Sequence, residues 1–279
     1  IRDVEFDYVI VDEAAKATFP ELAVSLNKAH KIILVGDHQQ LPPVLDTEII
    51  RNNKEKLDEE GLAQGIFERM YNMFPEDNKH RLTIQYRMHP TIGTLISHVF
   101  YNDEIQNGVE AQDRELCIEG YEGIAIEWIS TSKYSTKERY EKEFDNNGKK
   151  SYQNYLERNI IERKLLELDS KLVKRTKIAV ITGYGSQKYI LQTMVKQHSF
   201  KHIEVDVDTV DAFQGSQKDI ILYSTVRSSG NKYGIGFLKS EARINVAFSR
   251  ARCLLIIVGD MKFLDNYKIR GNKFPEIIK

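Results

Sequence analysis

The chain has 279 residues, enough for one large α/β domain or two smaller ones, and 41% of them are apolar. Its 40 Lys and Arg balance 41 Asp and Glu, so the formal charge of −1 neither indicates nor excludes a nucleic-acid partner. Two distant cysteines, Cys117 and Cys253, exclude a disulfide framework and a zinc site and indicate a reducing intracellular compartment, cytoplasm or nucleus. No apolar run is long enough to span a membrane, so no membrane partner is expected.

Short apolar runs rich in β-branched residues alternate along the chain with amphipathic stretches of helical length. Parallel sheets with helices on both faces produce this alternation, which predicts an α/β fold. The predicted strands cover residues 6–11, 31–35, 123–129, 177–182, 203–208, 219–225 and 253–258. The predicted helices cover residues 20–29, 63–73, 90–101, 153–170, 186–197 and 240–251.

Two polar stretches interrupt this alternation. Residues 46–61 are charged and are interpreted as a surface excursion, while residues 131–151 lack apolar periodicity and are predicted to form a mobile loop or insertion. A boundary near residues 75–85 is predicted to separate two domains, 1–80 and 81–279. Because the chain begins without Met just before a predicted buried strand, we expect it to be part of a longer protein.

Two adjacent carboxylates, Asp12 and Glu13, follow the first predicted strand in the run YVIVDEAA. Parallel sheets bind ligands at the carboxyl ends of their strands, and Mg²⁺ takes one or two carboxylates together with phosphate oxygens. Asp12 is therefore a candidate metal ligand, and Glu13 is a candidate for activating water. The alternative is an acidic pair that only begins a loop. The phosphate-binding loop GxxxxGK[ST] is absent from these residues.

Four further segments carry residues suited to a nucleotide or a nucleic acid. In GDHQQLPPV, Gln40 is suited to sense a terminal phosphate or to position water. In QYRMHP, Arg87 offers a planar fork of donors for phosphate, and Tyr86 offers a flat ring for a base. The structural alternatives are a turn stiffened by two prolines, an ordinary ion pair and a core tyrosine.

The other two segments lie near the C-terminus. In TVDAFQGSQKD, the hydroxyl of Thr209 and the backbone at Gly215 are suited to approach a sugar-phosphate chain or a nucleotide. In RINVAFSRAR, Arg250 is suited to stabilise charge that develops on a transferred phosphoryl group. A polar connection and a solvated basic face are the alternatives when each segment is considered alone.

Together these segments resemble a known family. In order, DEAA, GDHQQLPP, QYRMHP, ITGYGSQ, TVDAFQGSQKD and NVAFSRAR resemble motifs II to VI of superfamily 1 helicases. The likeness is closest to the up-frameshift and senataxin-like branch, whose typical strings are DEAAQ, GDxxQLxP, QYRMHP, TPYxxQ, VDxFQGxEKD and NVAxTRA. It extends from Tyr8 to about Gly259. Six motifs in the same order make this a specific resemblance.

The resemblance implies RecA-like sheets of the P-loop NTPase type, with one partial lobe and one complete lobe. It implies ATP and Mg²⁺ as cofactors and a single strand of RNA or DNA as partner, with 5′-to-3′ movement by a monomer. The catalytic residues that it implies are Asp12 for Mg²⁺, Glu13 for water, Gln40 and Arg87 for the γ-phosphate, and Arg250 as an arginine finger. The binding residues are Tyr86 for adenine, Gly215 and Gln217 near the nucleotide, and Thr182, Tyr184 and Thr209 for the strand.

Three positions depart from the family pattern. Gln217 stands where the family usually has Glu near the ribose, Gly183 replaces the Pro of TPY, and Lys16 replaces a Gln. The uncharged Gln217 still offers an acceptor, so sugar binding is expected to be weaker or differently tuned.

The first reading of the chain is the C-terminal motor portion of an ATP-dependent helicase. Because the phosphate-binding loop is missing, residues 1–279 alone are predicted to bind ATP weakly and to hydrolyse almost none. The alternative is a helicase-like scaffold that binds nucleic acid or protein without turnover. A DEAD-box enzyme is disfavoured by QYRMHP and QLPP. RNA and DNA stay open, and protein partners are expected to bind regions outside this chain.

Overall fold

The computed structural model describes residues 4–43, 65–146, 149–229 and 234–279. The chain divides into two compact units, Ile1–Arg81 and Leu82–Lys279, which we call unit 1 and unit 2 and describe separately. The interpretation of residues 1–80 and 81–279 as helicase lobes stays a prediction. The surface excursion predicted at 46–61 lies outside the described residues.

Unit 1 contains a parallel pair of strands with two helices. The strands are β1 (Phe6–Val11) and β2 (Ala29–Leu34), and the helices are α1 (Phe19–Leu26) and α4 (Ile66–Met73), with 3₁₀ turns at Ala14–Lys16 and Glu76–Asn78. Helix α1 begins with a capping box, in which Thr18 and Glu21 satisfy free backbone N–H groups at its start. The two predicted strands are confirmed, as are the predicted helices 20–29 and, over its described part, 63–73.

The buried core of unit 1 is small. Ala14, Leu22 and Phe67 are buried together on the side of the sheet that α1 covers. Strand register places Ile10 beside Ile33 on the opposite side, and both side chains are largely exposed. Parallel sheets normally bury both faces, but among the residues that the structure describes in unit 1 the Ile10 and Ile33 face is left exposed.

Unit 2 is built on a five-stranded parallel sheet with the order β5-β11-β10-β8-β9. Its strands are β5 (Ile126–Ser130), β8 (Thr176–Thr182), β9 (Ile203–Thr209), β10 (Lys218–Ser224) and β11 (Ala251–Gly259). Each matches a predicted strand to within a few residues. A short parallel pair, β3 (Ile84–Gln85) and β4 (Gln106–Asn107), lies outside this sheet and was not predicted.

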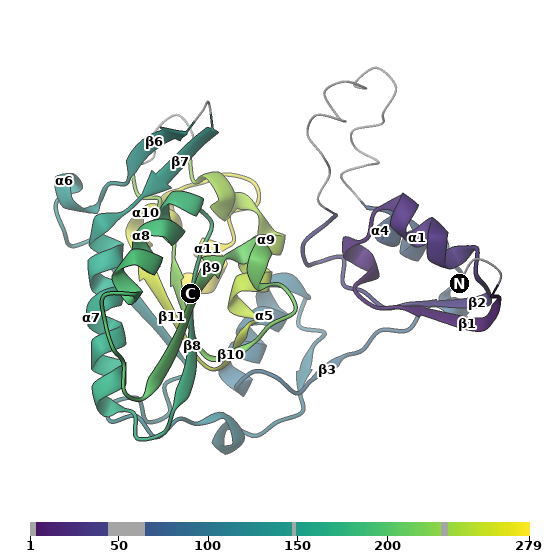
Figure 1. Ribbon diagram of the computed structural model, residues 1–279, viewed down its shortest axis with the longest axis horizontal. Coiled ribbons are helices and arrows are strands. Elements are labelled where there is room, and N and C mark those ends of the chain that lie inside the picture. Colours follow the sequence, from purple (N-terminus) through teal and green to yellow (C-terminus); the bar gives the residue numbers. More distant parts are fainter. Residues whose placement is uncertain (1–3, 44–64, 147–148, 230–233) are drawn as a thin grey trace. The chain divides into compact units, whose positions relative to one another are not determined.

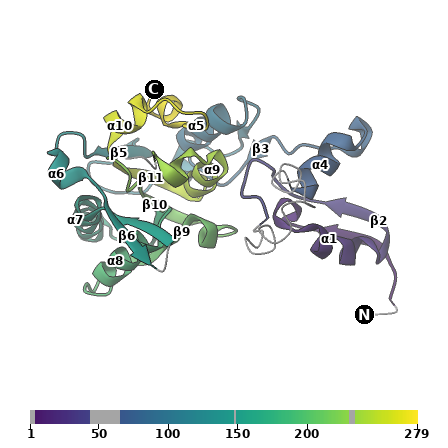
Figure 2. The same cartoon turned by 90° about the horizontal axis from the view of Figure 1, so that it is seen from above.

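Helices cover both faces of this sheet (Figure 2). One layer contains α7 (Tyr155–Lys171) and α8 (Gly185–Val195), and the other contains α5 (Pro90–Phe100) and α9 (Glu241–Phe248). Two short helices, α10 (Met261–Asn266) and α11 (Phe274–Ile278), follow the last strand. The predicted α/β fold with helices on both faces is confirmed in unit 2. Helix α9 ends earlier than the predicted 240–251 because β11 already begins at Ala251.

The strands of unit 2 bury both of their faces, as their continuous apolar runs predict. Leu222 and Leu165 belong to one core between the sheet and α7, and neither is accessible to solvent. On the other face Tyr223 contacts Phe248 of α9 edge-to-face, with ring centroids 5.3 Å apart. Of the predicted site residues, Thr182, Tyr184 and Thr209 lie at the carboxyl ends of these strands, whereas Gly215, Gln217 and Arg250 lie just before β10 and β11, at their amino ends.

Of the two alternatives predicted for residues 131–151, a mobile loop or an insertion, the loop is wrong. These residues form a short helix α6 (Thr136–Arg139) and an antiparallel hairpin of β6 (Lys142–Asn146) and β7 (Lys149–Gln153), drawn at the top of unit 2 in Figure 1. We call residues 131–153 the arm. Among the described residues, no helix is long and apolar enough to cross a membrane.

Candidate functional site

The carboxylates Asp12 and Glu13 lie exposed at the carboxyl end of β1. Asp12 Oδ1 accepts a hydrogen bond from the backbone N–H of Glu13 at 2.8 Å. Glu13 has φ 55° and ψ 32°, a left-handed conformation that costs a non-glycine residue roughly 1–2 kcal/mol. Strain of this kind persists only where neighbouring contacts enforce it, and it is concentrated at functional sites.

The loop after β2 supports these carboxylates. The N–H of Ala14 donates to the carbonyl of Val35 at 2.8 Å, which ties the acidic turn to the neighbouring strand. Gly36 is required here because a Cβ atom would lie 2.8 Å from the backbone N of Ala15. Further along this loop, Gln40 Nε2 donates to Asp37 Oδ2 at 2.8 Å. The two strands are parallel and adjacent, so Gln40 and the carboxylate pair share one edge of the sheet.

The two predicted arginines of unit 2 meet at Ser249, at the end of α9. Arg87 Nη1 donates to the carbonyl of Ser249 at 3.2 Å, and Arg250 Nη2 donates to the Ser249 hydroxyl at 3.2 Å. Arg250 is buried, and its Nε donates to the carbonyl of Val246 at 3.0 Å. Two motifs separated by more than 160 residues therefore place guanidinium groups around one serine.

The segment that carries Tyr86 and Arg87 is fixed by two side chains. Gln85 Oε1 accepts hydrogen bonds from the N–H groups of Arg87 at 2.9 Å and Met88 at 2.7 Å. Arg114 donates to the carbonyls of Arg87 at 2.8 Å and Tyr86 at 2.7 Å. The sequence analysis missed Arg114 because no family string contains it. These bonds hold the backbone, so the Tyr86 and Arg87 side chains project from a fixed base.

His89 begins α5 and docks the same segment onto β11. Its N–H donates to the carbonyl of Arg252 at 2.7 Å, and its Nδ1 accepts from the N–H of Thr91 at 3.1 Å. Burial lowers the pKa of His89, which keeps the imidazole neutral and able to accept this capping bond.

The ring of Tyr86 is 62% exposed and lies against Gly108, where a Cβ atom would come 2.4 Å from the ring. An exposed ring held by glycine backbone is suited to stack on a flat base. Gly215 has φ 82°, a conformation that favours glycine, and Gln217 is exposed two residues later. Arg250 contacts this loop, because its guanidinium reaches the carbonyl of Ser216 at 3.5 Å.

The predicted strand-binding residues lie at the carboxyl ends of β8 and β9. Thr182 pairs with Thr209 in the sheet, so these two are neighbours as expected. However, Thr182 is fully buried, and Tyr184 is only 3% exposed because its ring lies between Tyr152 and Phe237, with centroids 5.4 and 5.2 Å away. Burial raises the pKa of Tyr184 to about 12. A base can stack on Tyr184 only after these rings move, so its predicted role requires a conformational change.

A buried carboxylate that the sequence analysis missed grips the turn after β10. Glu157 accepts hydrogen bonds from the hydroxyls of Ser224 at 2.6 Å and Thr225 at 3.1 Å, and from the N–H of Val226 at 2.9 Å. Val226 has φ 69°, an outlier for a β-branched residue. Burial raises the pKa of Glu157 to about 8, against the effect of these hydrogen bonds.

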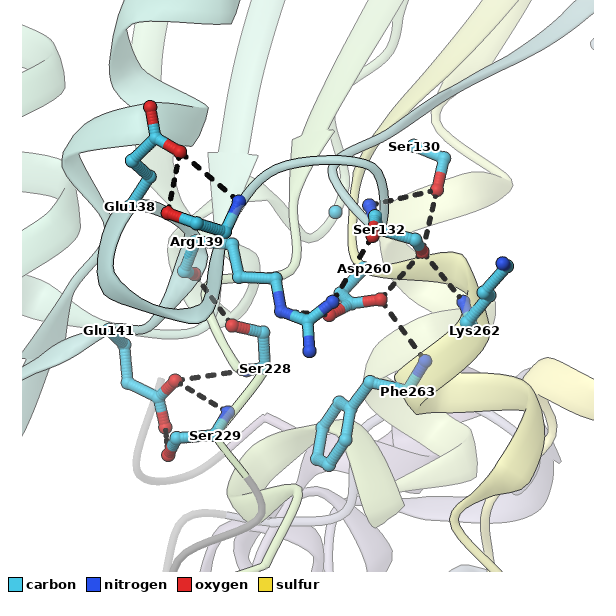
Figure 3. Close-up of polar contacts among 12 residues, drawn as sticks. Ser130, Ser132, Glu138, Arg139, Glu141, Ser228, Ser229, Asp260, Lys262 and Phe263 are labelled. Carbon is cyan, nitrogen blue, oxygen red and sulfur yellow. Dashed lines mark hydrogen bonds and ion pairs between the residues drawn. The ribbon is translucent and has the colours of Figure 1, made fainter.

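A second buried carboxylate, Glu141 of the arm, accepts hydrogen bonds from the residues just after this turn. It accepts from the N–H groups of Ser228 and Ser229, each at 2.9 Å, and from the Ser229 hydroxyl at 2.6 Å (Figure 3). Arg227 lies between the residues that Glu157 and Glu141 bind. Its Nε lies 3.3 Å from Glu141, and its guanidinium lies 4.0 Å from the centre of the Tyr152 ring. The turn after β10 is thus held in one conformation by side chains from the arm and α7.

The geometry can now be compared with known proteins. A family model described as an AAA domain matches residues 62–262, more than half of the chain, and a second AAA domain model matches residues 1–48. The chain is 36% identical over 276 residues to the regulator of nonsense transcripts 1 homolog of Neurospora crassa, and 36% identical over 267 residues to the ATP-dependent helicase NAM7 of Saccharomyces cerevisiae. The chain belongs to the superfamily 1 helicases. The predicted up-frameshift-like branch is confirmed by the same relatives.

These alignments cover 96% and 94% of the superfamily 1 chain, but only 24% and 26% of the two relatives. The chain therefore spans about a quarter of their length. Among solved structures, the PRRSV helicase is 17% identical with a TM-score of 0.43, covering 90% of this chain and 34% of that one. A likeness of this size supports no argument about the site.

Proposed function

We propose that this superfamily 1 chain is the C-terminal motor portion of an ATP-dependent helicase that moves 5′ to 3′ along single-stranded RNA or DNA. The observation that carries the proposal is the meeting of Arg87 and Arg250 at Ser249. Two guanidinium groups, one of them buried, are suited to an oxyanion that develops extra charge during phosphoryl transfer. A scaffold without turnover would not need this convergence.

The residues of unit 1 fit the metal that such chemistry uses. Asp12 presents a carboxylate at the end of a parallel strand, and no group of three or more His, Cys, Asp or Glu side chains that could hold a metal occurs among the described residues. Mg²⁺ commonly takes one or two carboxylates plus substrate phosphates, and Asp12 offers one such carboxylate. When bound, the metal neutralises charge on the phosphate oxygens.

The chain's own residues supply the remaining steps of the proposed reaction. Glu13, next to the metal ligand, orients and deprotonates the attacking water, and Gln40 senses the terminal phosphate from the loop after β2. Arg87 and Arg250 stabilise the transferring group, while the exposed ring of Tyr86 stacks on the base. Gly215 and Gln217 lie in the loop that Arg250 contacts, where they would face the sugar.

The test is ATP hydrolysis by the full-length protein with poly-U RNA or with single-stranded DNA. Stimulation by one of them establishes the motor and its substrate class, whereas no hydrolysis with either favours the scaffold. The 279-residue chain alone is expected to hydrolyse almost no ATP, because it holds no phosphate-binding loop. Strong ATP hydrolysis by residues 1–279 would contradict the prediction that these residues hold only part of an ATP site.

A further inference from the structure

The arm is fixed to the carboxyl edge of the unit 2 sheet. Besides the Glu141 grip, Arg139 Nε lies 3.3 Å from Asp260 Oδ2, just after β11. Asp260 Oδ1 accepts from the Ser132 hydroxyl at 2.6 Å (Figure 3). Asp260 is fully buried and its position is fixed further by the N–H of Phe263 at 3.1 Å. A buried polar network of this kind holds the arm rigidly at the edge where parallel sheets bind ligands.

The strand β6 separates its side chains by chemistry. Successive residues of a strand point to opposite sides. Glu141, just before the strand, is buried and holds the turn after β10, whereas Glu143 is exposed, accepts from Tyr152 and pairs with Lys150. Tyr140, Lys142 and Phe144 alternate with them and point outward. Strand alternation therefore places Glu143 on the face opposite to Lys142 and Phe144, and Glu141 is buried against the turn after β10.

The outward side chains are accessible. Tyr140 is 40% exposed, Phe144 is 39% exposed, and Tyr155, the first residue of α7, is 46% exposed. Cations stand beside two of these rings, with Arg139 5.6 Å from the centre of Tyr140 and Lys142 5.4 Å from the centre of Tyr155. Exposed rings interleaved with cations are what proteins use to stack bases and attract phosphates along a single strand.

The position of this strip matters because the arm covers Tyr184. The ring of Tyr152 in β7 packs on Tyr184, the aromatic residue predicted to stack on a base. The hairpin lies beside the start of α8, where its Ser151 hydroxyl accepts from the N–H of Ser186 at 3.1 Å. Bases that reach this edge of the sheet therefore meet the outer surface of the arm instead of Tyr184.

We propose that the outer surface of β6, formed by Tyr140, Lys142 and Phe144 together with Tyr155, binds the single strand by stacking bases on its rings and pairing phosphate with Lys142. This inference rests on the proposed function, since it assigns a binding surface for the same strand. It goes beyond the family motifs, because no motif string includes the arm.

The experiment measures the affinity of the 279-residue chain for fluorescein-labelled oligo-U and oligo-dT, by fluorescence anisotropy over a series of salt concentrations. Tyr140→Ala and Phe144→Ala are each expected to weaken binding about tenfold, the size of one lost stacked base. Lys142→Ala is expected to lower the log–log salt slope by about 0.7, the value of one phosphate contact on a single strand. The ring variants are expected to leave that slope unchanged.

Two controls test whether these effects belong to the arm. Leu166→Ala removes an apolar side chain on α7 of similar exposure, 44%, and Lys174→Ala removes an exposed cation from the loop that leads into β8 at the opposite end of the strands. Both are expected to bind as the unsubstituted chain does. Tyr140→Phe is expected to restore affinity, because the ring remains, and thermal melting verifies that every variant is folded.

The outcomes separate this inference from the proposed function. Unchanged affinity and salt slope in the arm variants would overturn the arm as a binding surface, as would a failure of the unsubstituted chain to bind either oligonucleotide. In each case the proposed function is decided by the strand-stimulated ATP hydrolysis of the full-length protein, which does not depend on these variants. An equal loss of affinity in the control variants would also overturn the inference.

Discussion

Unit 1 and unit 2 carry complementary halves of the proposed chemistry on very different supports. Unit 1 places exposed carboxylates on a two-stranded sheet, and few of the residues described in this unit are buried. Unit 2 places its arginines on a five-stranded sheet whose two faces are covered by helices. The difference teaches that the arginines are positioned by an established core, whereas the carboxylates depend on a strained turn and one neighbouring strand.

The largest effect is expected from removing one charged group in each unit. Arg250→Ala is expected to lower kcat for strand-stimulated ATP hydrolysis by the full-length protein about 10³-fold or more, the range of arginine fingers. Asp12→Asn is expected to have a similar effect, and the double variant to be little worse than either, if the proposed reaction uses both groups in the same step. Additive losses in steady-state kinetics would show that the two units do not serve the same reaction.

Truncation of apolar side chains tests the difference in burial. Leu222→Ala in unit 2 removes a fully buried side chain and is expected to lower the free energy of unfolding by about 2–5 kcal/mol. Ile10→Ala in unit 1 is expected to change it by less than about 1 kcal/mol, because that side chain is 67% exposed. Urea unfolding followed by the single tryptophan, Trp128, measures the first, and hydrogen exchange measures the second. Equal losses of unfolding free energy in the two variants would contradict the difference in burial between unit 1 and unit 2.

The buried acid Glu157 gives the stability of unit 2 a dependence on pH. Its pKa is about 8 in the folded chain and near 4.5 when unfolded. The folded state therefore holds the extra proton between these values, so this group's contribution is present at low pH and is lost as the pH rises through 8. Glu157→Gln is expected to flatten the fall in unfolding free energy between pH 5.5 and 8.5. Urea unfolding curves with the same slope against pH in both proteins would contradict this.

The smallest effect is expected at Gln217. Gln217→Glu restores the charge usual in the family and is expected to lower the KM for ATP a few-fold, with kcat unchanged, because the exposed side chain would bind sugar without taking part in bond cleavage. An unchanged KM in the full-length protein would mean that this position does not affect nucleotide use.

The features that depend on local sequence pattern could be predicted from the sequence. Continuous apolar runs predicted the strands of the main sheets, and the motif strings made Arg87 and Arg250 candidate site residues. Their meeting at Ser249 could not be predicted, since it depends on the packing of α9 against distant residues. The sequence did not predict the helix and hairpin of the arm, because their order depends on contacts such as that of Glu141 with Ser228, 87 residues away. Composition carries no signal of such contacts.

The anchors of the arm also determine when it can form. Ser132 bonds Asp260, which follows it by 128 residues, and Glu141 bonds Ser228 and Ser229. A ribosome adds residues one at a time from the N-terminus, so the arm is synthesised long before its partners exist. It can dock only after β10 and β11 have left the exit tunnel and joined the sheet. The arm therefore reaches its final position only after most of unit 2 has been synthesised.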